Sequence, residues 1–100
     1  MLEIKEIIKL HEMLKKANIP HIFKEYLEGY QIIIVENNIV LCDCVINRIS
    51  YGHEKGLLEI YGALTEKEYE EDEVLGYLNA KEVFKRFEYC YRNNTCTYVE

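Results

Sequence analysis

QIIIVENNIVLCDCVI, residues 31 to 46, is the stretch of sequence that decides the fold. Its first part, Gln31 to Val35, contains a run of β-branched residues, which is typical of a strand. Asn37 and Asn38 follow this run, and asparagine tolerates the positive φ angles of a tight hairpin turn. Ile39 to Ile46 then forms a second and longer apolar segment. The stretch therefore predicts an antiparallel β-hairpin.

Shorter extended segments lie on both sides of this hairpin. His21 to Tyr26 precedes it, and we expect Gly29 and Tyr30 to form part of the turn between them. Leu57 to Tyr61 follows the hairpin and ends at Gly62. Consecutive short strands that are joined by turns are typical of an antiparallel meander, here of three or four strands.

Two amphipathic segments flank the expected sheet. Residues 2 to 17 carry apolar side chains at helical spacing, and Pro20 prevents a continuation. Asn79 and Glu82 have the spacing of a capping box, which predicts a helix from Ala80 to about Arg92. Both apolar stripes are buried best when the helices pack on one face of the sheet.

The sequence thus predicts a single α+β domain over residues 1 to 100. Its expected order is an N-terminal helix, an antiparallel meander of three or four strands, and a C-terminal helix, with both helices packed on one sheet face. We expect residues 93 to 100 to form a polar tail, in which residues 97 to 99 are a candidate edge strand.

The chain has 100 residues and a formal net charge of −6, which is concentrated in one segment. The acidic segment, Glu66 to Glu73, contains six acidic residues and one lysine, so the rest of the chain sums to about −1. Thr65 and Glu68 have capping-box spacing, so the segment is either a short helical turn or a flexible acidic loop. The acidic balance argues against direct DNA binding, because phosphate contact needs clustered lysine and arginine.

The chain has no sequence feature of a membrane protein. No apolar run approaches the roughly 20 residues that a membrane helix needs. The charged start, Met1 to Glu6, does not resemble a signal peptide. We therefore expect a cytoplasmic protein. If a phage encodes it, the compartment is the cytoplasm of the host cell.

The chain has four cysteines, Cys42, Cys44, Cys90 and Cys96. A reduced compartment predicts no disulfides. None of the four forms the C-x-x-C pair of a standard zinc site. We expect Val40, Cys42, Cys44 and Ile46 to form one buried strand face, in which cysteine acts as a small hydrophobe. No metal ion or cofactor is predicted.

One segment, Asn47 to Gly56, concentrates polar chemistry and is long for a hairpin loop, where two to five residues are usual. Functional residues concentrate on loops that a rigid scaffold holds. The predicted ligand-binding residues lie in this loop, with one later tyrosine: Arg48, Ser50, Tyr51, Gly52, His53, Glu54, Lys55 and Tyr77. The alternative is a solvated loop whose histidine and tyrosine close one end of the sheet.

The chemistry of this loop suggests an anion site. Arg48 is suited to bidentate contact with a phosphate, and backbone amides near Gly52 are suited to hold an anion. A tyrosine, Tyr51 or Tyr77, would stack on a base, and Ser50 and His53 would supply hydrogen bonds. The loop is not a P-loop and lacks the two-histidine zinc motif, so no catalytic residue is assigned.

SYGHEKGLLEI at residues 50 to 60 and GYLNAKEVF at residues 76 to 84 resemble small uncharacterised proteins of phages and prophages of Gram-positive bacteria. The similarity covers most of the chain and includes LKKANIPH at residues 14 to 21. It implies a setting of counter-defence and immune evasion. Proteins of this class inhibit a host protein, or hold a nucleotide-derived immune signal at the subunit interfaces of a homo-oligomer.

Three function hypotheses follow. The first is a non-catalytic sponge that sequesters a small nucleotide-derived signalling molecule in a homo-oligomer, since a domain of this size has little room for an internal ligand pocket. The second is an acidic inhibitor that binds a basic surface of a host defence protein through Glu66 to Asp72. The third is a small nucleotide hydrolase that uses His53 and Glu54.

Overall fold

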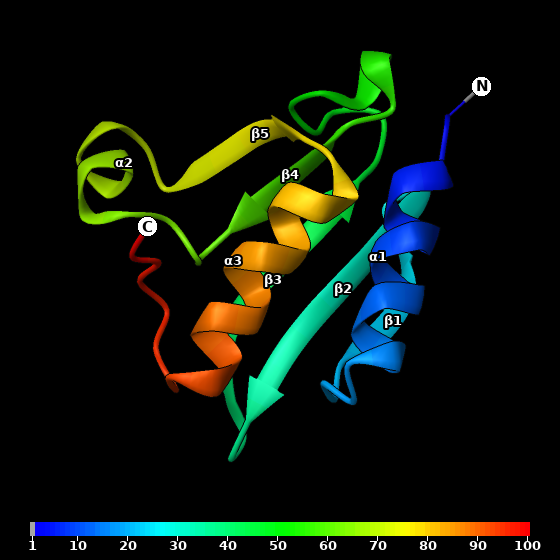
Figure 1. Ribbon diagram of the computed structural model, residues 1–100. Helices are drawn as coiled ribbons and strands as arrows, with labels where there is room; N and C mark the ends of the chain where they lie inside the picture. The colour runs from blue at the N-terminus through cyan, green and yellow to red at the C-terminus, as the bar shows by residue number, and fades with distance from the viewer. Residues whose placement is uncertain (1) are drawn as a thin grey trace.

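The computed structural model describes residues 2–100. Figure 1 shows the elements in chain order: α1 (Lys5–Lys16), β1 (Ile22–Tyr26), β2 (Gly29–Glu36), β3 (Ile39–Ile46), a single 3-10 turn η1 (His53–Lys55), β4 (Leu58–Tyr61), α2 (Glu66–Glu71), β5 (Val74–Leu78) and α3 (Ala80–Arg92). The strands form one five-stranded antiparallel sheet in the order β1-β2-β3-β4-β5. The α+β prediction is confirmed, with one strand more than expected.

The central hairpin is the one that the sequence predicts. Ile32 pairs with Cys44 and Ile34 with Cys42. Asn37 and Asn38 connect β2 to β3 with φ angles of 53° and 65°, the left-handed pair that a two-residue hairpin turn requires. The register shifts between Ile34 and its neighbour Val35, so the end of the hairpin is irregular.

The turn between β1 and β2 differs from the prediction. Leu27 and Glu28 form it, with φ angles of 48° and 62°, whereas Gly29 is the first residue of β2. A Cβ atom at Gly29 would lie 1.9 Å from the carbonyl oxygen of Ile46. Glycine therefore stands at residue 29 because two backbones approach closely there, and not because the chain turns.

The fifth strand, β5, was not predicted. It pairs with β4 through Tyr61 opposite Val74 and Leu58 opposite Leu78, with an irregular register between these pairs. Gly76 and the positive φ of 63° at Tyr77 interrupt any regular alternation. The strand forms because the free edge of β4 supplies its backbone hydrogen-bond partners. No local sequence pattern predicts such pairing between separate segments.

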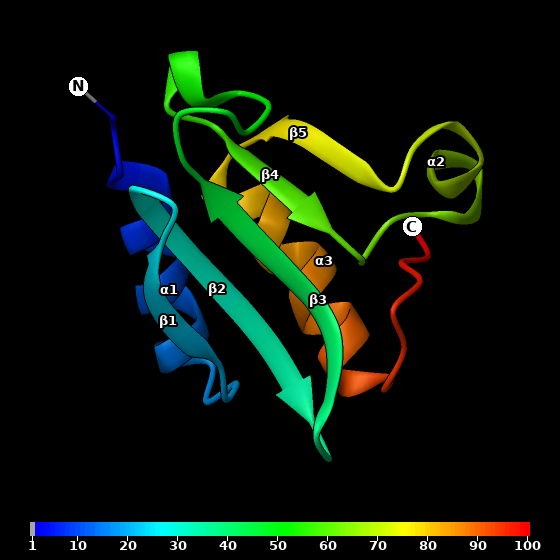
Figure 2. The ribbon, with the colours of Figure 1, turned by 180° about the vertical axis from the view of Figure 1, so that it is seen from behind.

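Both long helices, α1 and α3, cover the same face of the sheet, and Figure 2 shows the opposite face without a helix over it. We call this opposite side the open face. Three sets of fully buried side chains form the core, from α1, α3 and the covered face of the sheet: Ile7, Leu10 and Leu14; Val83, Phe87 and Cys90; Ile32, Ile34, Cys44, Ile46, Leu58 and Ile60.

The cysteine prediction holds for most of β3. Cys42, Cys44 and Ile46 are buried, but Val40 is 58% exposed because the register shift turns the end of the hairpin away from the core. All four cysteines are free, and Cys96 is exposed. No group of three or more metal-ligating side chains occurs within residues 2–100.

Both predicted capping boxes are present. The amide of Glu82 donates to Asn79 Oδ1 at 2.9 Å, and the amide of Asn79 donates to Glu82 Oε1 at 3.0 Å. The same reciprocal bonds join Thr65 and Glu68 at the start of α2. The acidic segment therefore begins as a short helix rather than as a flexible loop.

A bidentate ion pair ties α2 to α3. Arg86 donates to both carboxylate oxygens of Glu68, at 2.7 and 2.9 Å, and also to the carbonyl of Ala63 at 3.0 Å. The hydrogen bonds from Arg86 hold the pKa of Glu68 below its ordinary value. The short helix α2 is thereby held against the domain, although none of its own residues is buried.

The C-terminal segment is more than a polar tail. Tyr98 is only 5% exposed, and its amide donates to the carbonyl of Leu64 at 2.9 Å. Its ring packs edge-on against Tyr89 at 5.6 Å, and Arg86 lies over it at 4.9 Å. Instead of the edge strand considered for residues 97 to 99, Thr97 makes one isolated parallel bridge to Leu64.

Two histidines join α1 to the start of β1. His21 Nδ1 donates to the carbonyl of Ile19 at 2.8 Å, so its Nε2 accepts from His11 Nδ1, also at 2.8 Å. His11 is thus half-buried at the edge of the core with Nδ1 hydrogen-bonded, and both ring nitrogens of His21 bond to protein atoms. Burial, above all, lowers the pKa of His11.

No helix within residues 2–100 combines the length and the apolar character that crossing a membrane requires.

Candidate functional site

Ser50, in the loop that was predicted to bind a ligand, has a structural role. It is buried, and its hydroxyl both accepts from the amide of Asn47 at 3.0 Å and donates to the carbonyl of Asn47 at 3.1 Å. The Asn47 side chain in turn accepts from the amide of Ile49 at 3.0 Å. These bonds close the turn that follows β3, so the Ser50 hydroxyl is already satisfied by the protein.

The next part of the loop lies against β5. The amide of Tyr77 donates to the carbonyl of Tyr51 at 3.3 Å. A Cβ atom at Gly76 would lie 2.3 Å from Tyr51 Cβ, and one at Gly52, whose φ is 101°, would lie 2.9 Å from the Tyr77 amide nitrogen. Both glycines therefore allow a close approach that brings Tyr51 and Tyr77 together. These tyrosines are 55% and 50% exposed.

Glu54 binds the same tyrosine from the other side of the loop. The Tyr77 hydroxyl donates to Glu54 Oε2 at 2.5 Å. This hydrogen bond is the main reason why the pKa of Glu54 lies below, and that of Tyr77 above, its ordinary value. His53 and Lys55 lie beside Glu54 in η1, where His53 is half-buried and Lys55 is exposed. The acid thus fastens the loop to β5.

Arg48 does not join this group. Its guanidinium lies 3.7 Å from Glu28 on the turn between β1 and β2, and both side chains are largely exposed. The structure therefore divides the predicted residues. Tyr51, Glu54 and Tyr77 are in contact through hydrogen bonds. Arg48 makes its ion pair near β1 and β2, at the sheet edge opposite to β5.

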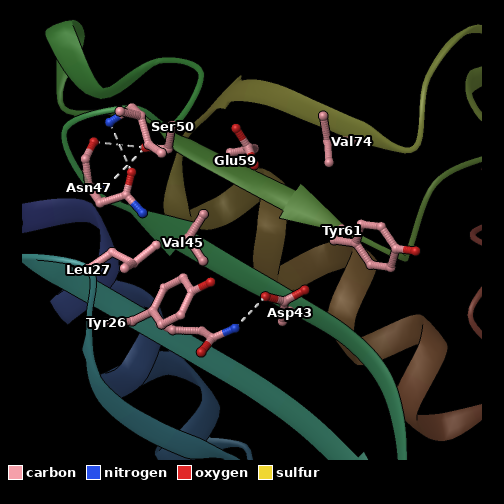
Figure 3. A pocket seen from close by; sticks show the side chains of 11 residues that line it. Tyr26, Leu27, Asp43, Val45, Asn47, Ser50, Glu59, Tyr61 and Val74 are labelled. Atoms are coloured by element: carbon pink, nitrogen blue, oxygen red, sulfur yellow. Dashed lines mark hydrogen bonds between the residues drawn. The ribbon is translucent and has the colours of Figure 1, made fainter.

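A different cavity lies on the open face of the sheet, and Figure 3 shows it from close by. It has a volume of about 290 Å³. All five strands contribute side chains to it: Tyr26 from β1, Gln31 from β2, Asp43 and Val45 from β3, Glu59 and Tyr61 from β4, and Val74 from β5. The first loop residues after β3, among them Asn47 and Ile49, close one end. We call this cavity the open-face pocket.

The polar groups of the open-face pocket are mainly acceptors. Gln31 Nε2 donates to Asp43 Oδ2 at 2.7 Å, and Glu59 Oε1 accepts from the Tyr51 amide at 2.8 Å. Burial raises the pKa of Asp43, and the bond from Gln31 opposes part of that rise. The pocket is lined by two carboxylates and by no lysine or arginine. It therefore favours a cationic or donor-rich group and disfavours a phosphate.

The acidic segment adjoins this pocket. Val74, which lines it, directly follows Glu73 and pairs with Tyr61. Most side chains of the segment are exposed, the chief exception being Glu68, which pairs with Arg86. The acidic segment therefore leads directly into the wall of the pocket at Val74.

Of the predicted site residues only Ser50 lines the open-face pocket, and sequence reasoning missed the others because they come mostly from five different strands. Asp43 interrupts an apolar strand between two cysteines, and Glu59 interrupts another between Leu58 and Ile60. The one available indication of the pocket in the sequence was a single acidic residue within each of these apolar strands. Only the sheet register places Asp43 opposite Tyr61 and Glu59 opposite Val45.

No protein-family model, no curated protein and no solved structure matches this chain.

Proposed function

We propose that the chain is a non-catalytic binding protein that docks the open face of its sheet onto a basic surface of a partner protein. The observation that carries this proposal is the open-face pocket, where Asp43 and Glu59 lie among apolar and aromatic side chains without a cation. Complementary charge contributes more to partner choice and association rate than to affinity itself. The proposal keeps the inhibitor hypothesis and adds the sheet face to the acidic segment.

The acidic segment supports the same partner. It carries a net charge of −5 within a chain of −6, and it adjoins the pocket at Val74. Such a concentration attracts a basic surface over distances of about a Debye length, about 8 Å at physiological salt. In the setting that the phage resemblance implies, the partner is a host defence protein. The pocket then supplies the short-range contacts.

Affinity purification with matched variants tests this function. Wild-type protein, Tyr61→Ala and Arg48→Ala would be immobilised in parallel and exposed to extract of a bacterial host, and bound proteins quantified by mass spectrometry. We expect a basic protein that wild type and Arg48→Ala retain equally, that Tyr61→Ala loses, and that salt elutes. Equal retention by Tyr61→Ala, or loss with Arg48→Ala instead, contradicts the proposal.

Nucleotide sequestration is a second candidate, and the pairing of Tyr51 with Tyr77 favours it. Tyr51 and Tyr77 are joined by a backbone hydrogen bond and both are half-exposed, so each offers a ring on which a base would stack, and Lys55 lies in the same loop. Glu54 beside them opposes an anionic ligand. In this candidate a second copy of the chain completes the site, which makes the functional unit a homo-oligomer.

Calorimetric titration with cyclic nucleotides and ADP-ribose derivatives tests the second candidate. Binding that Tyr51→Ala abolishes and Tyr61→Ala leaves unchanged supports it, and no binding by any nucleotide contradicts it. Mass analysis of the ligand after long incubation separates a sponge, which returns it intact, from a hydrolase that uses His53 and Glu54.

A further inference from the structure

Asp43 is a half-buried carboxylate that no cation neutralises. None of the ion pairs within residues 2–100 includes it. Its single hydrogen bond comes from Gln31 and occupies Oδ2. Burial without full compensation disfavours the charged carboxylate, which agrees with the raised pKa of Asp43. A cationic group that reached Asp43 would relieve this cost.

Two tyrosines line the pocket on either side of Asp43 in the view of Figure 3. Tyr61 stands opposite Asp43 in the sheet register, and Tyr26 comes from the edge strand β1. They are 54% and 39% exposed, so their rings are accessible. The ammonium of Lys24, on the same strand, lies 5.9 Å from the centroid of the Tyr26 ring, at the outer limit of a cation–π contact. Lys24 itself does not line the pocket.

We infer that the open-face pocket is the receptor for one arginine side chain of the partner protein, with the guanidinium on Asp43 and its plane against the tyrosines. This inference rests on the proposed function and names the chemistry of its anchor. Arginine is suited to this position because it presents five donors in a planar fork, stacks on aromatic rings and is more weakly hydrated than an ammonium. It is also among the residues that most often dominate interface energy.

The acceptor set of the pocket matches a guanidinium. Asp43 Oδ1, Gln31 Oε1 and Glu59 Oε2 accept no hydrogen bond from the described residues. The pocket, at about 290 Å³, lies just below the roughly 300 to 1,000 Å³ of pockets for drug-sized ligands, so it suits one side chain better than a whole nucleotide. The apolar floor at Val45 accommodates the arginine methylenes.

Amide NMR titration of the full chain tests this receptor. The probes are Nα-acetyl-arginine amide, the matching lysine compound and guanosine monophosphate. The test variant is Asp43→Asn, which keeps an oxygen that can accept from Gln31. The matched control is Glu12→Gln, which changes the net charge by the same amount at an exposed position of α1, on the other side of the sheet from the pocket.

We expect the arginine probe to shift the amides of β3 and β4 around the pocket and to bind several times more tightly than the lysine probe. Asp43→Asn should weaken this binding at least tenfold, while Glu12→Gln leaves it within twofold. Absence of shifts at the pocket, equal binding by Asp43→Asn, or tighter binding of guanosine monophosphate at the same amides overturns the inference.

Failure of this inference is distinguishable from failure of the proposed function. If the arginine probe does not bind but a basic partner still depends on Tyr61, the docking face stands and the arginine anchor is wrong. If the partner shows no dependence on Tyr61, the docking face itself is wrong.

Discussion

Arg86 and Glu68 show how a single residue pair secures a marginal element. Their side chains are only 11% and 28% exposed, and the pair is bidentate. Arg86 also donates to the carbonyl of Ala63, so it joins α3, α2 and the segment between β4 and α2. Capping residues predict that α2 begins at Glu66, but they do not predict what holds it in place.

Glu68→Gln should lower stability in a pH-dependent way. Arg86 lowers the pKa of Glu68 in the folded chain below the ordinary 4.5, so the carboxylate stabilises the fold above about pH 4.5. That contribution is lost as the pH falls through the lowered folded value. We expect the variant to unfold about 2 kcal/mol more easily near pH 7, the scale of hydrogen bonds to a charged group, and the gap to shrink toward pH 3.

Urea unfolding curves at several pH values measure this effect. Glu70→Gln, which removes an exposed carboxylate from the same helix, is the control and should follow wild type throughout. A gap between wild type and Glu68→Gln that stays constant from neutral to acidic pH would show that packing, and not charge, is responsible.

At the scale of the element, local chemistry determined the starts of helices and the turn of the central hairpin. The capping box at Asn79 and the left-handed pair Asn37–Asn38 are as predicted, and the capping box at Thr65 is present where the sequence left a helical turn and a flexible loop open. In contrast, Leu27 and Glu28 adopt left-handed φ angles that their side chains disfavour. The pairing of β1 with β2 imposes this turn. The prediction from the sequence, which placed the turn at Gly29, was therefore wrong.

Asn79→Ala should destabilise the protein by about 1 kcal/mol, the usual cost of removing an N-cap side chain. The variant loses the bond that the Glu82 amide donates to Asn79 Oδ1. Thermal unfolding followed by circular dichroism is a suitable measurement. Lys81→Ala, an exposed change in the first turn of α3, is the control and should have an effect below about 0.5 kcal/mol. A larger loss for the lysine variant would contradict the capping role.

At the scale of the whole molecule, the C-terminal segment completes the core instead of extending into solvent. Tyr98 is held by Tyr89, by Arg86 and by a backbone bond to Leu64. Its sequence neighbours are polar or exposed, so composition predicts a tail. The backbone bond between Tyr98 and Leu64 joins residues that are more than 30 positions apart. Only the folded chain therefore shows it.

Tyr98→Ala should therefore cost about 3 kcal/mol or more, the range for removing a buried aromatic side chain. This is a large part of the 5 to 15 kcal/mol that typically stabilises a domain. Val99→Ala is the matched control, since Val99 is 60% exposed and its loss should be nearly neutral. Equal denaturation midpoints for the two variants in guanidinium would show that the segment is a tail after all.

The sequence by itself determined the α+β class, the central hairpin, the cap of α3 and the burial of Cys42 and Cys44. Each of these follows from periodicity or from bonds within a few residues. Only the tertiary structure decided the fifth strand, the close backbone approach at Gly29 and the backbone contact between Tyr51 and Tyr77. It also assembled the open-face pocket, whose members, Asp43 among them, come from all five strands. Register and edge pairing create such features, and these depend on contacts between distant segments that no local pattern encodes.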